Sequence, residues 1–282
     1  MPLATPFGRY CPYLLGSDYV SLSGNARLES GLLRDIALGA THTVVEPGTH
    51  ILAALRDGIT VAELDTLAAR HGLLNGQLAE LLGFLNLAGI LLRRRTLYRW
   101  PEAILRQTWH LCLNIRYAPL AWRQPATYTS LIHAIFRATS LVAIATIIVS
   151  LLIIVAGMPT FVVISHSLFG VIVFMGSLYA HEATHMFIIK RHGHTPAMLQ
   201  RGLRLGILHT TLPTRNEVIC SIAGPLAGIS SALSVSVAAF AIPYPTHGLL
   251  ALIVSGFHAL SLLPWYGDGA SIRHALQRRS TL

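Results

Sequence analysis

The segment TFVVISHSLFGVIVFMGSLYAHEATHMFII, residues 160–189, combines a long apolar run with His181, Glu182 and His185 near its end. The run is longer than the roughly 20 residues that a helix needs to cross a bilayer. An ionisable side chain in a membrane span costs roughly 2.5–3.5 kcal/mol on insertion scales, so it is by default a candidate functional residue. The segment therefore predicts a membrane-spanning helix with a polar site near one end.

The composition of the whole chain also indicates a membrane protein. Of its 282 residues, 53% are hydrophobic and only 12% are charged, and the mean hydropathy is +0.57. These values exclude an ordinary soluble domain. Residues 1–30 contain no compact apolar run typical of a signal peptide, so we expect insertion through internal spans. The widely spaced cysteines, Cys11, Cys112 and Cys220, predict reduced thiols facing the cytosol.

Four apolar segments predict four spans, at about 138–156, 160–189, 218–242 and 247–263. Basic residues precede the first span, lie between the second and third, and follow the fourth: Arg116, Arg123, Arg137, Lys190, Arg191, Arg201, Arg204, Arg215, Arg273, Arg278 and Arg279. The positive-inside rule then predicts a multi-pass protein of the cell membrane with both termini in the cytoplasm. This topology explains most of the net charge of +9, so we expect lipid contact and no nucleic-acid partner.

The histidine pair in the second span predicts a metal site. Residues four apart share one face of a helix, so His181 and His185 can hold one ion while Glu182 reaches a water beside it. A catalytic zinc site takes three protein ligands, and Asp268 is the remaining acidic residue near the fourth span. We therefore predict Zn²⁺ bound by His181, His185 and Asp268. Histidines that only pack in a bundle and an Asp-Gly turn are the structural alternatives.

Six other histidines beyond residue 160 are rival ligands, with the one on the fourth span the strongest: His166, His192, His194, His209, His247 and His258.

Three motifs occur in order: HEATH at 181–185, SIAGPLAG at 221–228 and LLPWYGDG at 262–269. Together they resemble the site-2 protease group of membrane-embedded zinc metallopeptidases, over about residues 135–275. The resemblance implies the same three zinc ligands, Glu182 as general base, and a helix shaped beside the site by Gly224 and Pro225. Small-residue helix packing is the alternative explanation of those two residues.

The same resemblance leaves the group that stabilises the transition state open. His258 and Ser261 are the candidates, and Ser261 stands where the family commonly has asparagine. The implied reaction is metal-assisted hydrolysis of a peptide that is locally unwound.

Residues 1–100 contain most of the acidic residues and predict a small separate domain. We expect extended segments at YVSL (19–22) and THTVV (41–45), and a helix that begins with a capping box from Thr60 to Glu63. Asn75 is expected to cap the next helix and Gly89 to end it. ILLRRRTLYRW (90–100) predicts a strand or wing whose arginines are solvated or face the membrane.

These segments resemble the small winged-helix domains related to the PqqD leader-peptide chaperone, over about residues 17–97. The resemblance implies that a leader peptide joins a sheet edge as an extra strand. A helical domain without a ligand and a DNA-binding winged helix are the alternatives. Residues 101–135, with Trp109, Tyr117 and Trp122, predict an interfacial linker at the headgroup level or a solvated one, and residues 136–282 the membrane domain.

The expected fold class is thus mainly α, a multi-pass helical bundle of about four spans preceded by a winged-helix α+β domain. The expected function is a membrane zinc endopeptidase that removes the leader from a ribosomally made precursor peptide, or matures it, near the cytoplasmic face. Two alternatives stay open. One is site-2-type cleavage of a membrane-anchored regulator, and the other is a nonenzymatic membrane adaptor that binds a leader peptide.

Overall fold

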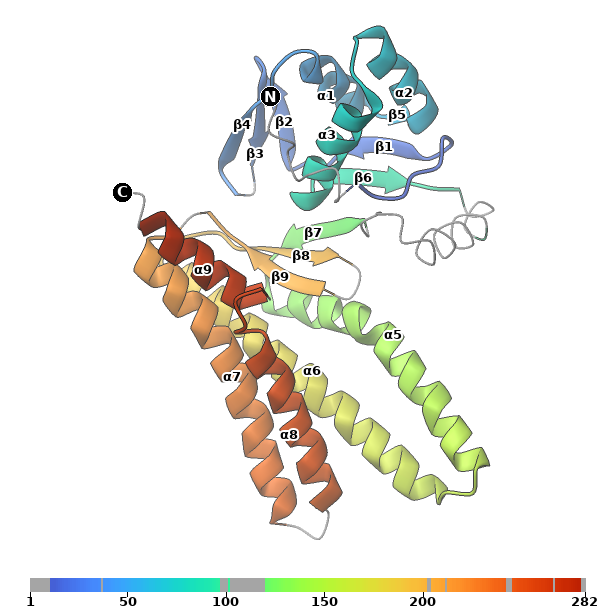
Figure 1. The fold of residues 1–282 in the computed structure, drawn as a ribbon, viewed down its shortest axis with the longest axis vertical. Helices are drawn as coiled ribbons and strands as arrows, with labels where there is room; N and C mark the ends of the chain where they lie inside the picture. The colour runs from blue at the N-terminus through green and yellow to red at the C-terminus, as the bar shows by residue number, and fades with distance from the viewer. Residues whose placement is uncertain are drawn as a thin grey trace. The chain divides into compact units, whose positions relative to one another are not determined.

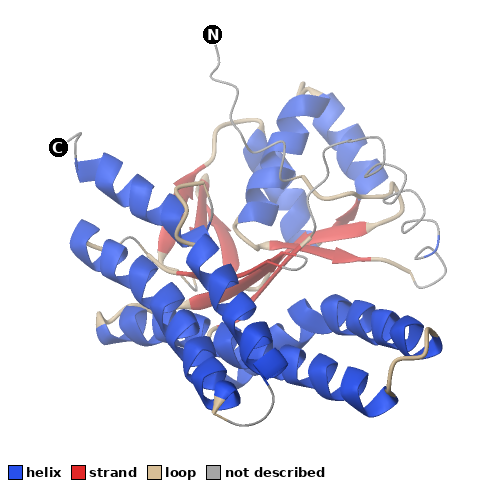
Figure 2. Ribbon diagram, turned by 60° about the horizontal axis from the view of Figure 1, so that its bottom comes forward, coloured by secondary structure: helices blue, strands red, loops and turns tan. Residues whose placement is uncertain are grey.

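The computed structural model describes residues 11–36, 38–96, 101, 120–201, 204–210, 212–241, 245–265 and 267–279. Within these ranges the chain is mainly helical, with three small sheets (Figures 1 and 2). It divides into two compact units. We call residues 1–124 with 199–204 the N-terminal unit, and residues 125–198 with 205–282 the helical unit.

Two antiparallel sheets belong to the N-terminal unit. In the first, β1 (Tyr19–Leu22) lies between β5 (Ile59–Thr60) and β6 (Leu91–Arg94). The segment YVSL is therefore a strand, as predicted. The second sheet is a meander of β2 (Ala26–Glu29), β3 (Leu32–Asp35) and β4 (Ala40–Thr43). The strand order β2-β3-β4 leaves β4 at one edge, and the predicted extended segment 41–45 is a strand only as far as Thr43.

Three helices complete the N-terminal unit: α1 (Gly48–Asp57), α2 (Val61–Arg70) and α3 (Asn75–Leu87). The predicted capping box begins α2, because the Glu63 N–H donates to Thr60 Oγ1 and the Thr60 N–H donates to Glu63 Oε2. The prediction that Asn75 caps α3 is wrong. Leu74 is the capping residue, and its N–H donates to Oε1 of Gln77 at 3.0 Å, so Gln77 reaches back to the cap residue as the glutamate or glutamine of a capping box does.

Leucine, isoleucine and valine side chains from all these elements form the buried core of the N-terminal unit, with Val20, Leu33, Ile51, Leu52, Leu55, Leu64 and Leu85 fully buried. Two bidentate ion pairs lie beside this core. Arg95 binds Asp18, and Arg123 binds Asp35, with every one of these side chains at most 3% exposed. The prediction of a solvated or membrane-facing wing is therefore wrong at Arg95, because its guanidinium is buried against a carboxylate.

The helical unit is built from α5 (Tyr128–Val155), α6 (Thr160–Arg191), α7 (Thr214–Phe240), α8 (Pro245–Leu260) and α9 (Gly267–Arg279). Figure 1 shows α6, α7 and α8 packed along one another, with α5 beside α6. Small and branched residues form the contact between them, including Val173, Ala232, Ala251 and Val254. Large apolar side chains cover the outward faces, where Val155 is 85% and Phe161 is 78% exposed.

Two described helices, α6 and α7, are long and apolar enough to cross a membrane. The two halves of α5, Tyr128–Ser140 and Val142–Val155, make a third candidate if they form one span with a bend of 44°. α8 is apolar but has only 16 residues. The structure thus supports two or three spans by length and composition, fewer than the four predicted.

The C-terminal part of the predicted linker, residues 101–135, differs from the prediction. α5 begins at Tyr128, inside the predicted range 101–135, and residues 121–125 form strand β7 (Ala121–Pro125). Residues 102–119, with Trp109, Cys112 and Tyr117, lie outside the described part of the chain. The middle loop contributes β8 (Ala197–Arg201) and β9 (Arg204–Leu208), which form a sheet of order β7-β8-β9 that the sequence did not predict.

Candidate metal centre

The motif HEATH lies within α6, which runs without interruption from Thr160 to Arg191. Because His181 and His185 are four residues apart, their rings lie on one face of the helix, with centroids 4.9 Å apart. Both side chains are buried, at 6% and 8% exposure. A buried imidazole needs partners for its ring nitrogens, and both nitrogens of each ring have one.

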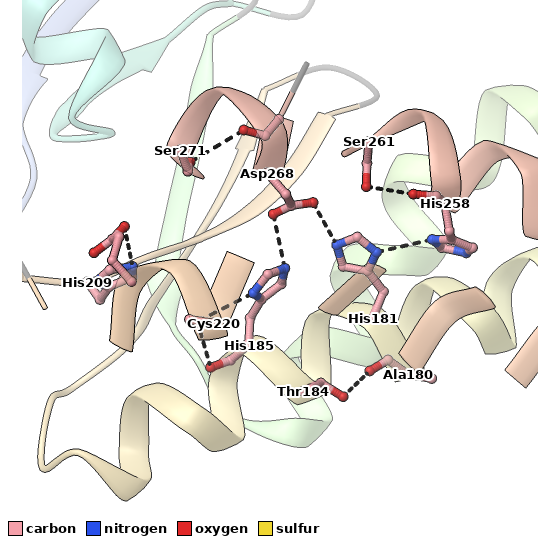
Figure 3. A network of polar contacts seen from close by, with 12 residues as sticks. Ala180, His181, Thr184, His185, His209, Cys220, His258, Ser261, Asp268 and Ser271 are labelled. Atoms are coloured by element: carbon pink, nitrogen blue, oxygen red, sulfur yellow. Dashed lines mark hydrogen bonds and ion pairs between the residues drawn. The ribbon is translucent and has the colours of Figure 1, made fainter. Parts of the chain in front are cut away.

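The Nε2 atoms of both histidines face Asp268, at the start of α9. Nε2 of His181 lies 3.3 Å from Oδ2 of Asp268, and Nε2 of His185 lies 3.2 Å from Oδ1. Figure 3 shows the carboxylate reaching both imidazoles, one oxygen to each ring. The three residues each offer a ligand atom, and these atoms all lie within 4.8 Å of one another, so the group could hold a metal ion.

Asp268 reaches this position because the chain turns tightly after α8. The Gly269 N–H donates to the carbonyl of Ser261 at 2.9 Å, and a Cβ at position 269 would collide with the carbonyl groups of Leu262 and Leu263. Glycine on the far side of Asp268 therefore lets α9 start directly against the end of α8. Gly269 thus serves the placement of the carboxylate.

The two separations between a histidine nitrogen and a carboxylate oxygen fit a single bound ion. A tetrahedral ion with bonds of about 2.0–2.1 Å holds its ligand atoms about 3.3 Å apart, close to the two nitrogen–oxygen distances of 3.3 and 3.2 Å. Burial disfavours the charged form of Asp268, but the imidazoles of His181 and His185 that lie against its two oxygens outweigh this effect and hold the pKa of the carboxyl well below its ordinary value. The group is therefore anionic at neutral pH, as a metal ligand must be.

Glu182 lies beside this group and is 5% exposed. Its Oε2 is buried and has no hydrogen-bond partner among the described residues. A buried carboxylate oxygen without a partner is costly. The role of Glu182 as a general base stays a prediction.

Helix α7 forms the wall behind His185. A Cβ at position 224 would overlap the imidazole of His185, so only glycine leaves room for the ring. Pro225 lies inside α7 without ending it, and because proline has no N–H, the carbonyl of Ser221 loses its usual helical partner. Both predicted site-shaping residues, Gly224 and Pro225, are buried next to the site.

The Nδ1 atoms of the two histidines have different partners. Nδ1 of His185 lies 3.5 Å from Sγ of Cys220 on α7, and Nδ1 of His181 lies 3.1 Å from Nδ1 of His258 on α8. Sequence reasoning missed Cys220, which carried no signal beyond its position four residues before Gly224. It also missed Ser177, which bonds His258 and whose signal was its place one turn before His181.

The two candidates for stabilising a transition state make other contacts in the structure. Both ring nitrogens of His258 are engaged, one by His181 and one by Ser177. The Ser261 hydroxyl donates to the carbonyl of His258 at 2.8 Å. Their proposed role in the transition state stays a prediction.

Of the rival histidines, His258 contacts His181 but not Asp268 or His185 through any contact described above, and the others make contacts elsewhere. Nε2 of His247 lies 3.1 Å from the Ser165 hydroxyl, and His166 stacks on His247. In the loops, His194 contacts Thr210, and Nε2 of His209 lies 3.7 Å from Glu217. Among the described residues only His181, His185 and Asp268 form a group of metal-ligand geometry.

Comparison with protein-family models, curated proteins and solved structures finds no match to this chain.

Proposed function

We propose that the chain is a membrane-embedded zinc endopeptidase that cleaves a precursor peptide near the cytoplasmic face of the membrane. The observation that carries the proposal is the joint placement of His181, His185 and Asp268 beside the unpartnered carboxylate of Glu182. Two imidazoles and one carboxylate are a ligand set that catalytic zinc uses, with one position left for water. The motifs on these residues are those that resemble the site-2 protease group.

The chain's own residues would divide the reaction between them. His181, His185 and Asp268 would hold the ion, which when bound supplies a Lewis acid that makes water nucleophilic near neutral pH. Oε2 of Glu182 would accept the proton of the attacking water and return it to the nitrogen of the leaving amine. The buried setting keeps other water away from these groups. The nucleophile is water, so no covalent link to the protein forms.

The membrane topology completes this proposal. α6, α7 and the bent α5 are the candidate spans, and α8 would be a fourth crossing that is shorter because the chain turns into α9 at the level of the site. Basic residues flank the ends of α6 and α7 that lie next to the site, at Lys190, Arg191 and Arg215. The positive-inside rule then places the site and both termini on the cytoplasmic side of the cell membrane.

The N-terminal unit contains a groove that suits an extended peptide. It has a volume of about 700 Å³, and it is lined by residues 41–48 along edge strand β4 and by Leu73, Gln77, Leu81 and Phe84 of α3 and the turn before it. An edge strand offers unpaired main-chain groups to an added strand, and the apolar helix face offers contacts for its side chains. We propose that this winged-helix unit binds the leader segment of the precursor here.

Tethering the two functions in one chain is useful because a leader held by the groove raises the local concentration of its cleavage site. A short flexible connection gives an effective concentration in the millimolar range. Recognition through the main chain would also tolerate variation in the leader sequence, since hydrogen bonds of an added strand do not read side chains.

The decisive experiment compares Glu182→Gln with wild type, by mass spectrometry of the peptides that accumulate in the native host and by zinc content of the purified protein. The variant keeps the size and burial of the side chain but cannot accept a proton. We expect uncleaved precursor to accumulate, with turnover lowered by about 10²–10⁴-fold and zinc retained. Glu217→Gln is the matched control, because Glu217 is also a largely buried glutamate but pairs with His209.

An unchanged peptide inventory in Glu182→Gln would contradict proteolysis and favour the nonenzymatic adaptor. The leader hypothesis is tested separately by Leu81→Glu, which puts a charge into the groove, with Leu74→Glu as control because Leu74 is 71% exposed. We expect only Leu81→Glu to weaken binding of a fluorescent leader peptide. Full-rate processing of a soluble precursor by that variant would contradict leader recognition at this groove.

A further inference from the structure

The ligand candidate His181 contacts a second buried histidine that lies outside the ligand group. Nδ1 of His181 is 3.1 Å from Nδ1 of His258, and Nε2 of His258 is 3.0 Å from the hydroxyl of Ser177. Ser177 lies on α6 one turn before His181, and His258 comes from α8. Figure 3 shows His258, His181 and Asp268 in one chain of contacts.

The direction of each hydrogen bond in the series from Ser177 through His258 to His181 follows from the contact that Ser177 makes. The Ser177 hydroxyl donates to the carbonyl oxygen of Phe174 at 3.0 Å, and a carbonyl can only accept. The hydroxyl has a single proton, so its oxygen must accept from Nε2–H of His258. A neutral imidazole carries one ring proton. Nδ1 of His258 is therefore an acceptor, and Nδ1 of His181 must donate to it.

The position of this proton determines which nitrogen of His181 can bind a metal. With its proton on Nδ1, a neutral His181 has a lone pair on Nε2, the nitrogen that faces Asp268. We propose that His258 is a positioning residue that holds His181 in the tautomer and orientation required of a metal ligand. The inference rests on the metal site of the proposed function. Outer partners of ligating histidines normally fix the tautomer in this way, and their loss weakens metal binding by about 10–100-fold.

Helix α7 makes room for both imidazole contacts with two glycines. A Cβ at position 228 would lie 2.6 Å from Nδ1 of His258, the atom that accepts from His181. Gly224, one turn earlier, leaves room for His185. The spacing of these glycines is therefore explained by two histidine rings, one that binds and one that positions, in addition to close helix packing.

Helix α8, which contains His258, also offers a matched control. His247, also on α8, is 7% exposed, and its Nε2 lies 3.1 Å from the hydroxyl of Ser165 on α6. Like His258 it joins α8 to a serine of α6 through a buried imidazole. It differs in that its ring packs against His166 and Phe169, which do not belong to the group of His181, His185 and Asp268.

The test uses the full-length protein in detergent with His258→Leu, His258→Asn and His247→Leu, and measures zinc retained against a competing chelator. Asparagine can place Oδ1 near the position of Nδ1 and accept from His181, whereas leucine cannot. We expect His258→Leu to lose about 10–100-fold in zinc affinity, His258→Asn to recover most of it, and His247→Leu to remain near wild type. The absorption spectrum of the Co²⁺-loaded protein should change in His258→Leu alone.

Wild-type affinity in His258→Leu would overturn the inference, as would equal losses in the two leucine variants or a failure of asparagine to recover binding. A wild-type protein that binds no stoichiometric zinc gives a different result, because it removes the metal site itself. The two failures are therefore distinguishable in one set of measurements.

Discussion

Oδ1 of Asp268 lies 3.2 Å from Nε2 of His185, which joins the first turn of α9 to the later part of α6. The contact brings a carboxylate from a short turn onto a helix that is long and apolar enough to cross a membrane. Such a pairing is costly in an apolar setting unless the charges have partners. Together with His181, these two groups could hold a metal ion.

Replacing Asp268 with asparagine should remove metal from the site. The amide is similar in size to the carboxylate but lacks its charge, and an uncharged group binds zinc poorly. We expect zinc affinity to fall by more than the roughly 10–100-fold seen for outer partners. Elemental analysis after dialysis against a chelator measures this. Glu217→Gln should keep its zinc, and full retention by Asp268→Asn would show that the carboxylate is no ligand.

Adding one methyl group at Gly224 should displace His185. The new Cβ would overlap the imidazole, so either the ring or α7 must shift, and a shift of a ligand lowers metal affinity. We expect Gly224→Ala to lose most of its zinc. Gly256→Ala on α8 is the control because a Cβ there has nothing within 4 Å. Equal zinc content in the two variants would contradict the close approach of α7.

Local sequence signals predicted the helices and the polar site more successfully than the sheets. The capping box at Thr60 and Glu63 is a short-range signal, and the structure confirms it. Asn75 was misjudged because the side chain of Gln77, inside the helix, satisfies the N–H of Leu74. The spacing of His181 and His185 predicted one shared face, and the two rings lie together on α6.

Most contacts between distant segments, other than that of Asp268 with His181 and His185, were not predicted from the sequence. Strands β7, β8 and β9 are short and pair across the chain, so no periodic pattern announces them. The burial of Arg95 depends on Asp18, which is adjacent only after folding. His258 looked like a rival ligand or a transition-state group, since its distance from Ser177 and His181 is set by the packing of α8 against α6.

The buried ion pair between Asp35 and Arg123 should contribute strongly to the stability of the N-terminal unit. Both side chains are 2% exposed, and the guanidinium binds both carboxylate oxygens. Asp35→Asn leaves a buried charge without its partner, so we expect a loss of about 3–5 kcal/mol in stability. The exposed pair of Glu29 and Arg34 is the control, and Glu29→Gln should cost at most about 1 kcal/mol. Thermal unfolding and limited proteolysis of the full chain would separate the two, and similar losses would refute the difference.

The Cys11 thiol should be a poor nucleophile in the folded protein. Burial and then the charge of Asp65 raise its pKa from 9.0 to about 11, and only the thiolate reacts with iodoacetamide. At pH 8 we expect alkylation of Cys11, followed by peptide mapping, to be about 100-fold slower in the native protein than in urea, and slightly faster in Asp65→Asn. Because the folded pKa is the higher one, this group's contribution to stability is complete below the unfolded pKa and is lost as the pH rises towards about 11. An equal rate with and without urea at pH 8 would mean that the thiol is not shielded by the fold.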